Sequence, residues 1–236
     1  MIICWGGGIS QLVKYFSTDT DLVFSQAINR TIMGNGAINE YVNCRFPTSF
    51  DGMLIADSED LMRVCVAPWG KLFRREVFQL HDLRYPEGLH YEDIFLHWTF
   101  CVLAPRIYFI PTPTYVYTTN RPDSIMSNTN KNTGNEKAFF KIVRRIFEFH
   151  QKNGTFVKIN SVAAKLAERY YEDTKKYSDE TKYPYYSRVL RRILREFDVD
   201  CENCRPLRLI KNRSWFTVYF RRPKDWFLPR DRARKF

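Results

Sequence analysis

The sequence predicts a mixed α/β fold with short strands in the front of the chain and helices in the back. Before about residue 127, short runs of β-branched and aromatic residues alternate with turns that contain Gly or Pro. After about residue 135, apolar residues recur at the spacing of amphipathic helices. We therefore predict a strand–helix domain at 1–127, a helical extension at 128–204 and a basic, aromatic tail at 205–236.

Composition supports a folded, globular chain. Its 236 residues are 44% hydrophobic and 16% aromatic, which is enough to bury a core. No window approaches the roughly 18 apolar residues of a membrane span, and no secretory signal is recognisable at the start. We expect a cytoplasmic protein.

Cys201 and Cys204 are the one pair of cysteines with metal or redox spacing, and without a second pair we expect a reduced loop.

The first sixty residues predict a helix and two strands. Gly6–Gly8 is interpreted as a turn before a helix whose apolar face spans residues 9–16. Residues 22–28 and 37–42 read as strands, and the turn signal Met33–Gly36 separates them.

The middle of the chain predicts shorter elements. An acidic N-cap at Asp57–Asp60 precedes a short helix. Residues 68–78 are interpreted as a strand or loop followed by a second short helix. Residues 94–103 are apolar on nearly all sides, which predicts a helix buried between layers.

Two short strands follow that helix, at Ile107–Ile110 and at Tyr115–Tyr117. Pro111 and Pro113 are expected to separate them, because proline cannot donate to a sheet ladder. The back half then predicts three amphipathic helices. They cover residues from about 135 to about 153, 157–175 and 185–197.

Glu92 and Asp93 follow the turn Tyr85–Gly88 at the start of the apolar helix. Acidic residues in a first helical turn are favoured by the helix dipole, so helix capping is one interpretation of the pair. A catalytic base held on a supported element is the other. The residues alone leave both open.

The order of several motifs resembles the second half of family 2 glycosyltransferases, which build capsule, lipopolysaccharide and similar glycans. The likeness spans about residues 19–126 and is carried by Trp69–Arg75, Tyr85–Gly88, Tyr91–Asp93, Ile107–Ile110, Tyr115–Tyr117 and Asn120–Ile125. The resemblance implies the acceptor-side half of a GT-A fold. The nucleotide-sugar-binding half, with its Asp-x-Asp metal motif, would precede Met1, so we expect that half to be missing from this chain.

The resemblance also implies site residues. Asp93 would remove the acceptor hydroxyl proton during an inverting transfer, with Glu92 as an orienting neighbour or stand-in. The helix dipole is expected to lower the pKa of Asp93. A divalent metal, Mn²⁺ or Mg²⁺, is implied, and its ligands are expected to lie outside the chain; Asp57 and Glu59 are weak internal candidates.

Three further residues have candidate binding roles. Trp69 is either an apolar wall for a sugar ring or a core residue, and Lys71 is expected to face the acceptor cleft. Arg121 is either a ligand of diphosphate oxygens or a solvated loop residue.

The tail concentrates the positive charge. Residues 205–236 carry eleven basic and two acidic residues, a net charge of +9, whereas residues 1–204 carry 26 basic and 24 acidic residues. Interleaved aromatic residues favour either contact with an anionic membrane surface, at the inner face of the membrane, or docking on the helices; nucleic acid is disfavoured.

The function predicted from the sequence is transfer of a sugar from a nucleotide-diphosphate donor to a hydroxyl of a glycan or lipid-linked acceptor. The alternative is a non-catalytic remnant of such an enzyme that binds glycan or a membrane surface.

Overall fold

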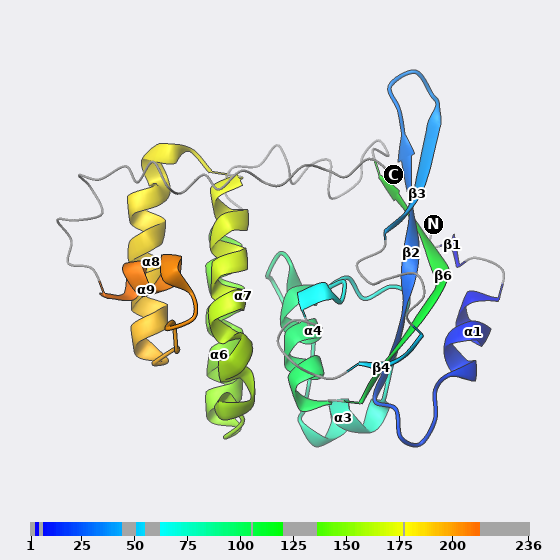
Figure 1. Cartoon of the computed structure of the whole chain (residues 1–236), viewed down its shortest axis with the longest axis horizontal. Helices are drawn as coiled ribbons and strands as arrows, with labels where there is room; N and C mark the ends of the chain where they lie inside the picture. Colours follow the sequence, from blue (N-terminus) through cyan, green and yellow to red (C-terminus); the bar gives the residue numbers. More distant parts are fainter. Residues whose placement is uncertain are drawn as a thin grey trace.

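The computed structural model describes residues 3–4, 7–43, 51–54, 62–104, 106–119, 136–176 and 178–212. The front half forms a sheet with three flanking helices, and the back half is helical (Figure 1). The strands are β1 (Ile3–Cys4), β2 (Leu22–Ile32), β3 (Ile38–Asn43), β4 (Gly52–Leu54), β5 (Lys71–Phe73) and β6 (Ile107–Thr119). The helices are α1 (Gly8–Lys14), α3 (Arg75–Leu80), α4 (Glu92–Leu103), α6 (Glu136–Lys152), α7 (Phe156–Lys176), the 3-10 turn η1 (Glu180–Lys182), α8 (Tyr183–Glu196) and α9 (Arg205–Asn212).

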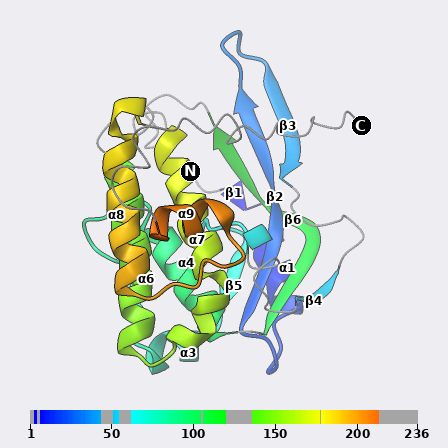
Figure 2. The same cartoon turned by 60° about the vertical axis from the view of Figure 1, so that its left-hand side comes forward.

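The sheet is built on two long parallel strands, β2 and β6. Short antiparallel strands extend it on both sides: β3 and β5 pair with β2, and β1 and β4 pair with β6. The β2–β3 hairpin confirms the two predicted strands and the turn between them, and it projects beyond the rest of the sheet (Figure 2).

The prediction that Pro111 and Pro113 separate two strands is wrong, because β6 runs unbroken through both. The register explains how this is possible. Ser25 of β2 lies opposite Ile110 and Ala27 lies opposite Tyr115, so four residues of β6 face a single residue of β2. This irregular segment frees the prolines from the ladder hydrogen bonds that they cannot donate.

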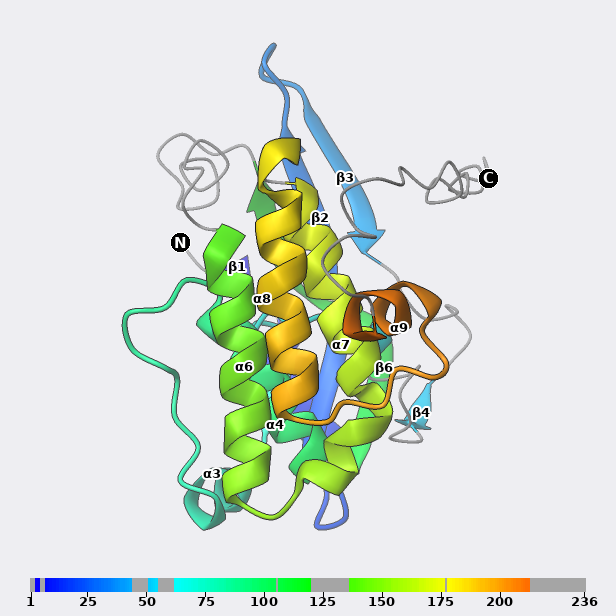
Figure 3. The same cartoon turned by 90° about the vertical axis from the view of Figure 1, so that its left-hand side faces the viewer.

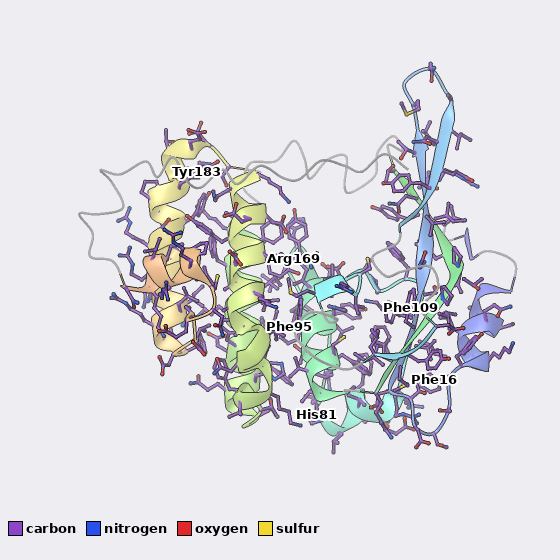
Figure 4. The ribbon with its side chains drawn as sticks, viewed as in Figure 1. Phe16, His81, Phe95, Phe109, Arg169 and Tyr183 are labelled. Carbon is purple, nitrogen blue, oxygen red and sulfur yellow. The ribbon has the colours of Figure 1, made fainter. Side chains whose placement is uncertain are left out.

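Helix α4 lies between the sheet and the back helices, as its apolar sequence predicts (Figure 1). Every residue from Ile94 to Val102 is buried. Phe95 lies on the side of α4 toward α6 and α7, and Phe109 lies on the sheet side (Figure 4). Trp98 Nε1 donates a hydrogen bond to the Tyr170 hydroxyl of α7 at 3.3 Å. One hydrophobic core therefore joins the sheet to the helical extension.

The back helices confirm the three predicted amphipathic segments. Helices α6, α7 and α8 lie side by side, and α9 packs against α7 and α8 (Figure 3). Leu207 and Ile210 are buried, so α9, the first eight residues of the predicted tail, is docked on the core. Cys201 and Cys204 are buried free thiols, and burial raises the pKa of Cys204 to about 12.

Helix α1 forms as predicted, but only part of its predicted apolar face packs against the protein. Leu12 is buried against the sheet, whereas Ile9 and Val13 are exposed. Gly8 explains the close approach of this helix, since a Cβ there would lie 2.4 Å from the carbonyl oxygen of Thr114. No helix among the described residues is long and apolar enough to cross a membrane.

Candidate functional site

The turn before α4 fixes the direction in which its first residues point. Gly88 has a left-handed backbone with φ of 68°, and so does Tyr91, the N-cap residue, with φ of 66°. A left-handed conformation is unfavourable for a tyrosine and persists only where its surroundings hold it. The Tyr91 ring is stacked on Phe139 of α6, with centroids 4.4 Å apart. Packing on the back helices thus holds the entry to α4.

Asp93 lies in the first turn of α4 and is partly buried. Its Oδ1 accepts a hydrogen bond from the backbone N–H of Ile94 at 2.9 Å. A capping side chain normally bonds the N–H two or three residues later, and the N-cap residue here makes no side-chain cap hydrogen bond. Asp93 is therefore not the N-cap residue, but its carboxylate accepts a first-turn N–H at the positive end of the helix dipole, so the helix-start interpretation stays open beside the catalytic one.

The pKa of Asp93 is raised, so the prediction of a lowered pKa is wrong. Burial of the carboxyl is the main cause, and the negative charge of Glu92 adds to it. The Ile94 N–H and the charge of Lys71 oppose the rise without cancelling it. Desolvation outweighs the helix dipole here, because α4 is inserted into the core. A carboxylate with a raised pKa is a stronger proton acceptor, which suits a general base.

Lys71, on β5, lies near Asp93 and is tied to α4. Its Nζ donates to the carbonyl oxygen of Cys65 and lies 3.1 Å from His97 Nδ1. Burial lowers the pKa of Lys71, and the negative charge of Asp93 acts against that lowering. That Lys71 faces an acceptor cleft stays a prediction. Its described side-chain contacts join it to Cys65 and to His97 in the middle of α4.

Sequence reasoning missed two neighbours of this site. His97 is buried and comes one helical turn after Asp93, so it holds Lys71 on the same side of α4 as the carboxylate. The four-residue spacing from Asp93 was the available signal. Tyr85 lies close enough that Asp93 and Glu92 help burial to raise its pKa. The position of Tyr85 in the turn before Glu92 and Asp93 has no helical spacing that would predict its proximity to them.

Trp69 packs against the sheet face of β6. Its ring is stacked on Tyr115, with centroids 4.9 Å apart and planes 9° apart, and on Tyr117 at 5.4 Å and 19°. The indole is only partly buried. The packing interpretation accounts for these contacts, and a role as a wall for a sugar ring stays a prediction. Gly70 follows with φ of 66° and leaves room for Ser25.

The remaining predicted site residues, Asp57, Glu59 and Arg121, lie outside the described residues. Within the described part of the chain, no group of three or more His, Cys, Asp or Glu side chains could hold a metal ion. The described residues therefore supply no three-ligand site for the metal that the family resemblance implies. Asp21, a further carboxylate near the N-terminus, is bound by Arg106 and Arg74.

Neither a family model nor a curated protein matches the sequence. Solved structures do resemble the fold. The structure of S. aureus TarS 1-349 in complex with UDP-GlcNAc matches with a TM-score of 0.57 and 15% identity, over 87% of this chain and 58% of that one. The complex of TarS 1-349 with UDP matches with a TM-score of 0.52 and 14% identity, over 87% and 56%.

The fold resembles that of TarS 1-349. The fold class expected from the sequence is therefore confirmed, as a mixed α/β structure with a curled sheet and helices. Both matched structures contain UDP or UDP-GlcNAc. The chain spans a little over half the length of each. Membership of family 2, and the assignment of this chain to the acceptor side, stay predictions.

Proposed function

We propose that this chain is the acceptor-side portion of an inverting glycosyltransferase, which transfers a sugar from a nucleotide-diphosphate donor to a hydroxyl of a glycan or lipid-linked acceptor. The proposal rests on the position and environment of Asp93. It is a partly buried carboxylate with a raised pKa, at the start of a buried helix, in a fold similar to that of a protein bound to UDP-GlcNAc.

In the proposed reaction, Asp93 accepts the proton of the acceptor hydroxyl as the oxygen attacks the anomeric carbon. The bond between that carbon and the diphosphate oxygen breaks, and the nucleoside diphosphate leaves with the electron pair. An alcohol needs such a positioned base, because it is a poor nucleophile while protonated. The negative charge of Glu92 raises the proton affinity of Asp93, which gives the neighbouring acid a specific role.

Turnover with a matched pair of variants tests the proposal. UDP-GlcNAc is the first donor to try, because TarS binds it, with Mn²⁺ or Mg²⁺ present and a panel of glycan acceptors. Asp93→Asn should abolish any transfer that the wild-type chain catalyses, since removing a general base typically costs about 10²–10⁴-fold. Glu92→Gln should retain transfer and move the acidic limb of the pH–rate profile to lower pH, because it removes a charge that raises the pKa of Asp93.

Two results would contradict the proposal. Wild-type turnover by Asp93→Asn removes Asp93 from the mechanism. A calorimetric titration of the chain with nucleotide sugars and Mn²⁺ that shows no heat, together with no turnover, favours the non-catalytic remnant. Circular dichroism of each variant provides the folding control.

Two finer points belong to the same proposal. Trp69 and Lys71 are proposed to contact the acceptor, and Arg121 is proposed to contact the diphosphate. The tail is proposed to bring the protein to an anionic membrane where a lipid-linked acceptor would lie.

A further inference from the structure

Helix α8 carries a row of arginines on the face that it turns away from the core. Tyr186, Leu190, Ile193 and Leu194 are buried on its inner face. A shallow groove of about 520 Å³ opens on the outer face. It is lined by Arg188, Arg191, Arg192, Arg195 and Glu196.

Two of these arginines are held by α9. Arg191 Nε donates to the carbonyl oxygen of Ile210 at 2.7 Å, and Arg195 Nε donates to that of Lys211 at 3.0 Å. These carbonyls lie in the last turn of α9, where no further helical N–H is available to them. The guanidinium groups therefore have fixed positions along the groove and are not loose surface side chains.

The groove gathers like charges. Four arginines against one glutamate give it a formal charge of +3. The one carboxylate is also engaged elsewhere, because Glu196 Oε1 accepts a hydrogen bond from Arg144 of α6. Burial lowers the pKa of Arg191, and the positive charge of Arg195 lowers it further. Repulsion of this kind costs stability, and an anionic partner would relieve it.

We propose that the arginine face of α8 (Arg188, Arg191, Arg192 and Arg195) binds the headgroups of an anionic membrane. The shape of the surface favours this partner over a single small anion. The four residues span about 10 Å along the helix, at a rise of about 1.5 Å per residue, and the groove is open. Such a surface contacts several headgroups at once.

The sequence that follows α9 favours a membrane in particular. Seven aromatic residues are interleaved with basic residues after Asn212: Trp215, Phe216, Tyr219, Phe220, Trp226, Phe227 and Phe236. Tryptophan and tyrosine next to cations are typical of membrane-surface segments, since the rings settle at headgroup depth. The aromatic sequence therefore continues from the helix that holds Arg191 and Arg195 in place.

Vesicle flotation with a double variant tests this surface. The full chain is mixed with vesicles of 30% phosphatidylglycerol in phosphatidylcholine, or of phosphatidylcholine alone. Arg188→Gln/Arg192→Gln leaves the two arginines that bond α9 unchanged. Each cation near an anionic surface contributes about five-fold to binding, so the double variant should bind the anionic vesicles about 30-fold more weakly.

The matched control is Lys14→Gln/Arg75→Gln, which removes the same charge from α1 and α3. Helix α1 lies across the sheet from α8 (Figure 1). The control should bind the anionic vesicles like the wild type, and the wild type should not bind phosphatidylcholine alone.

Several outcomes would overturn the inference: equal binding by the double variant and the wild type, an equal loss in the control, or equal binding to both kinds of vesicle. Release of the wild type from vesicles by an equal phosphate concentration of double-stranded DNA would favour nucleic acid instead. Flotation needs no turnover, so its result is independent of the Asp93 experiment. Urea unfolding of both double variants checks that the fold is intact.

Discussion

His150 should make the stability of this protein fall steeply between neutral and mildly acidic pH. It is fully buried at the end of α6 near His81, which Figure 4 labels at the lower end of the molecule. Its Nδ1 lies 2.9 Å from the Thr155 hydroxyl, and its Nε2 has no hydrogen-bond partner within the described residues. Burial lowers its pKa to about 4, helped by the positive charges of His81 and Lys158.

The sign and size of the effect follow from linkage. Between pH 6.5 and 4 the unfolded chain binds a proton at this histidine and the folded chain does not, so stability is lost as the pH falls. A shift from about 6.5 to about 4 gives a loss of roughly 2 kcal/mol between pH 7.5 and 5.0, on the order of 3 kcal/mol when complete. The folded state is the one that resists protonation.

Urea unfolding at pH 7.5 and 5.0, followed by circular dichroism, measures this loss. His150→Asn keeps a polar atom near Nδ1 and removes the titration. Its stability should therefore fall by about 2 kcal/mol less than that of the wild type over this pH interval. His90→Asn, which changes an exposed histidine, should behave like the wild type. If His150→Asn showed the same pH dependence as the wild type, the assignment of this proton to His150 would be refuted.

Two further predictions concern the sheet. Gly8→Ala should destabilise the protein by about 1–3 kcal/mol, because its Cβ would overlap the Thr114 carbonyl; Gly34→Ala, with open space around it, should be nearly neutral, and equal melting temperatures would contradict the close approach. Asp21→Asn should lower the Tm at pH 7 by about 2–4 °C. Burial acts to raise the pKa of Asp21, but the hydrogen bonds and charge of Arg106 hold it below its usual value, so the difference from the wild type should shrink as the pH falls below about 4. A difference that grew towards acidic pH would contradict that sign.

The acidic pair illustrates how far the candidate site could be predicted. The turn and the apolar run placed Glu92 and Asp93 on the first turn of a helix, and the structure confirms that position. The sign of the pKa shift of Asp93 was predicted wrongly, because a helix start says nothing about how much water the fold removes from the carboxyl. Burial decides the sign here, and burial is a property of the packed molecule.

The same limit applies to the contacts between distant segments. The spacing of Lys71 and His97 does not predict that their side chains meet, because the two residues are 26 positions apart and on different elements. Trp69 likewise finds Tyr115 and Tyr117 only after β6 is in place.

Local patterns determined most of this protein's elements. The hairpin of β2 and β3, the buried helix α4 and the amphipathic helices α6, α7 and α8 follow from periodicity and from turn residues, since both act between near neighbours. Tertiary structure alone decided that Pro111 and Pro113 lie inside β6. Strand β2 aligns against them with a four-to-one irregularity, and that pairing joins residues about 85 positions apart. The local sequence determines which secondary structure a segment prefers. The strand that pairs with a segment determines which backbone hydrogen bonds that segment must make.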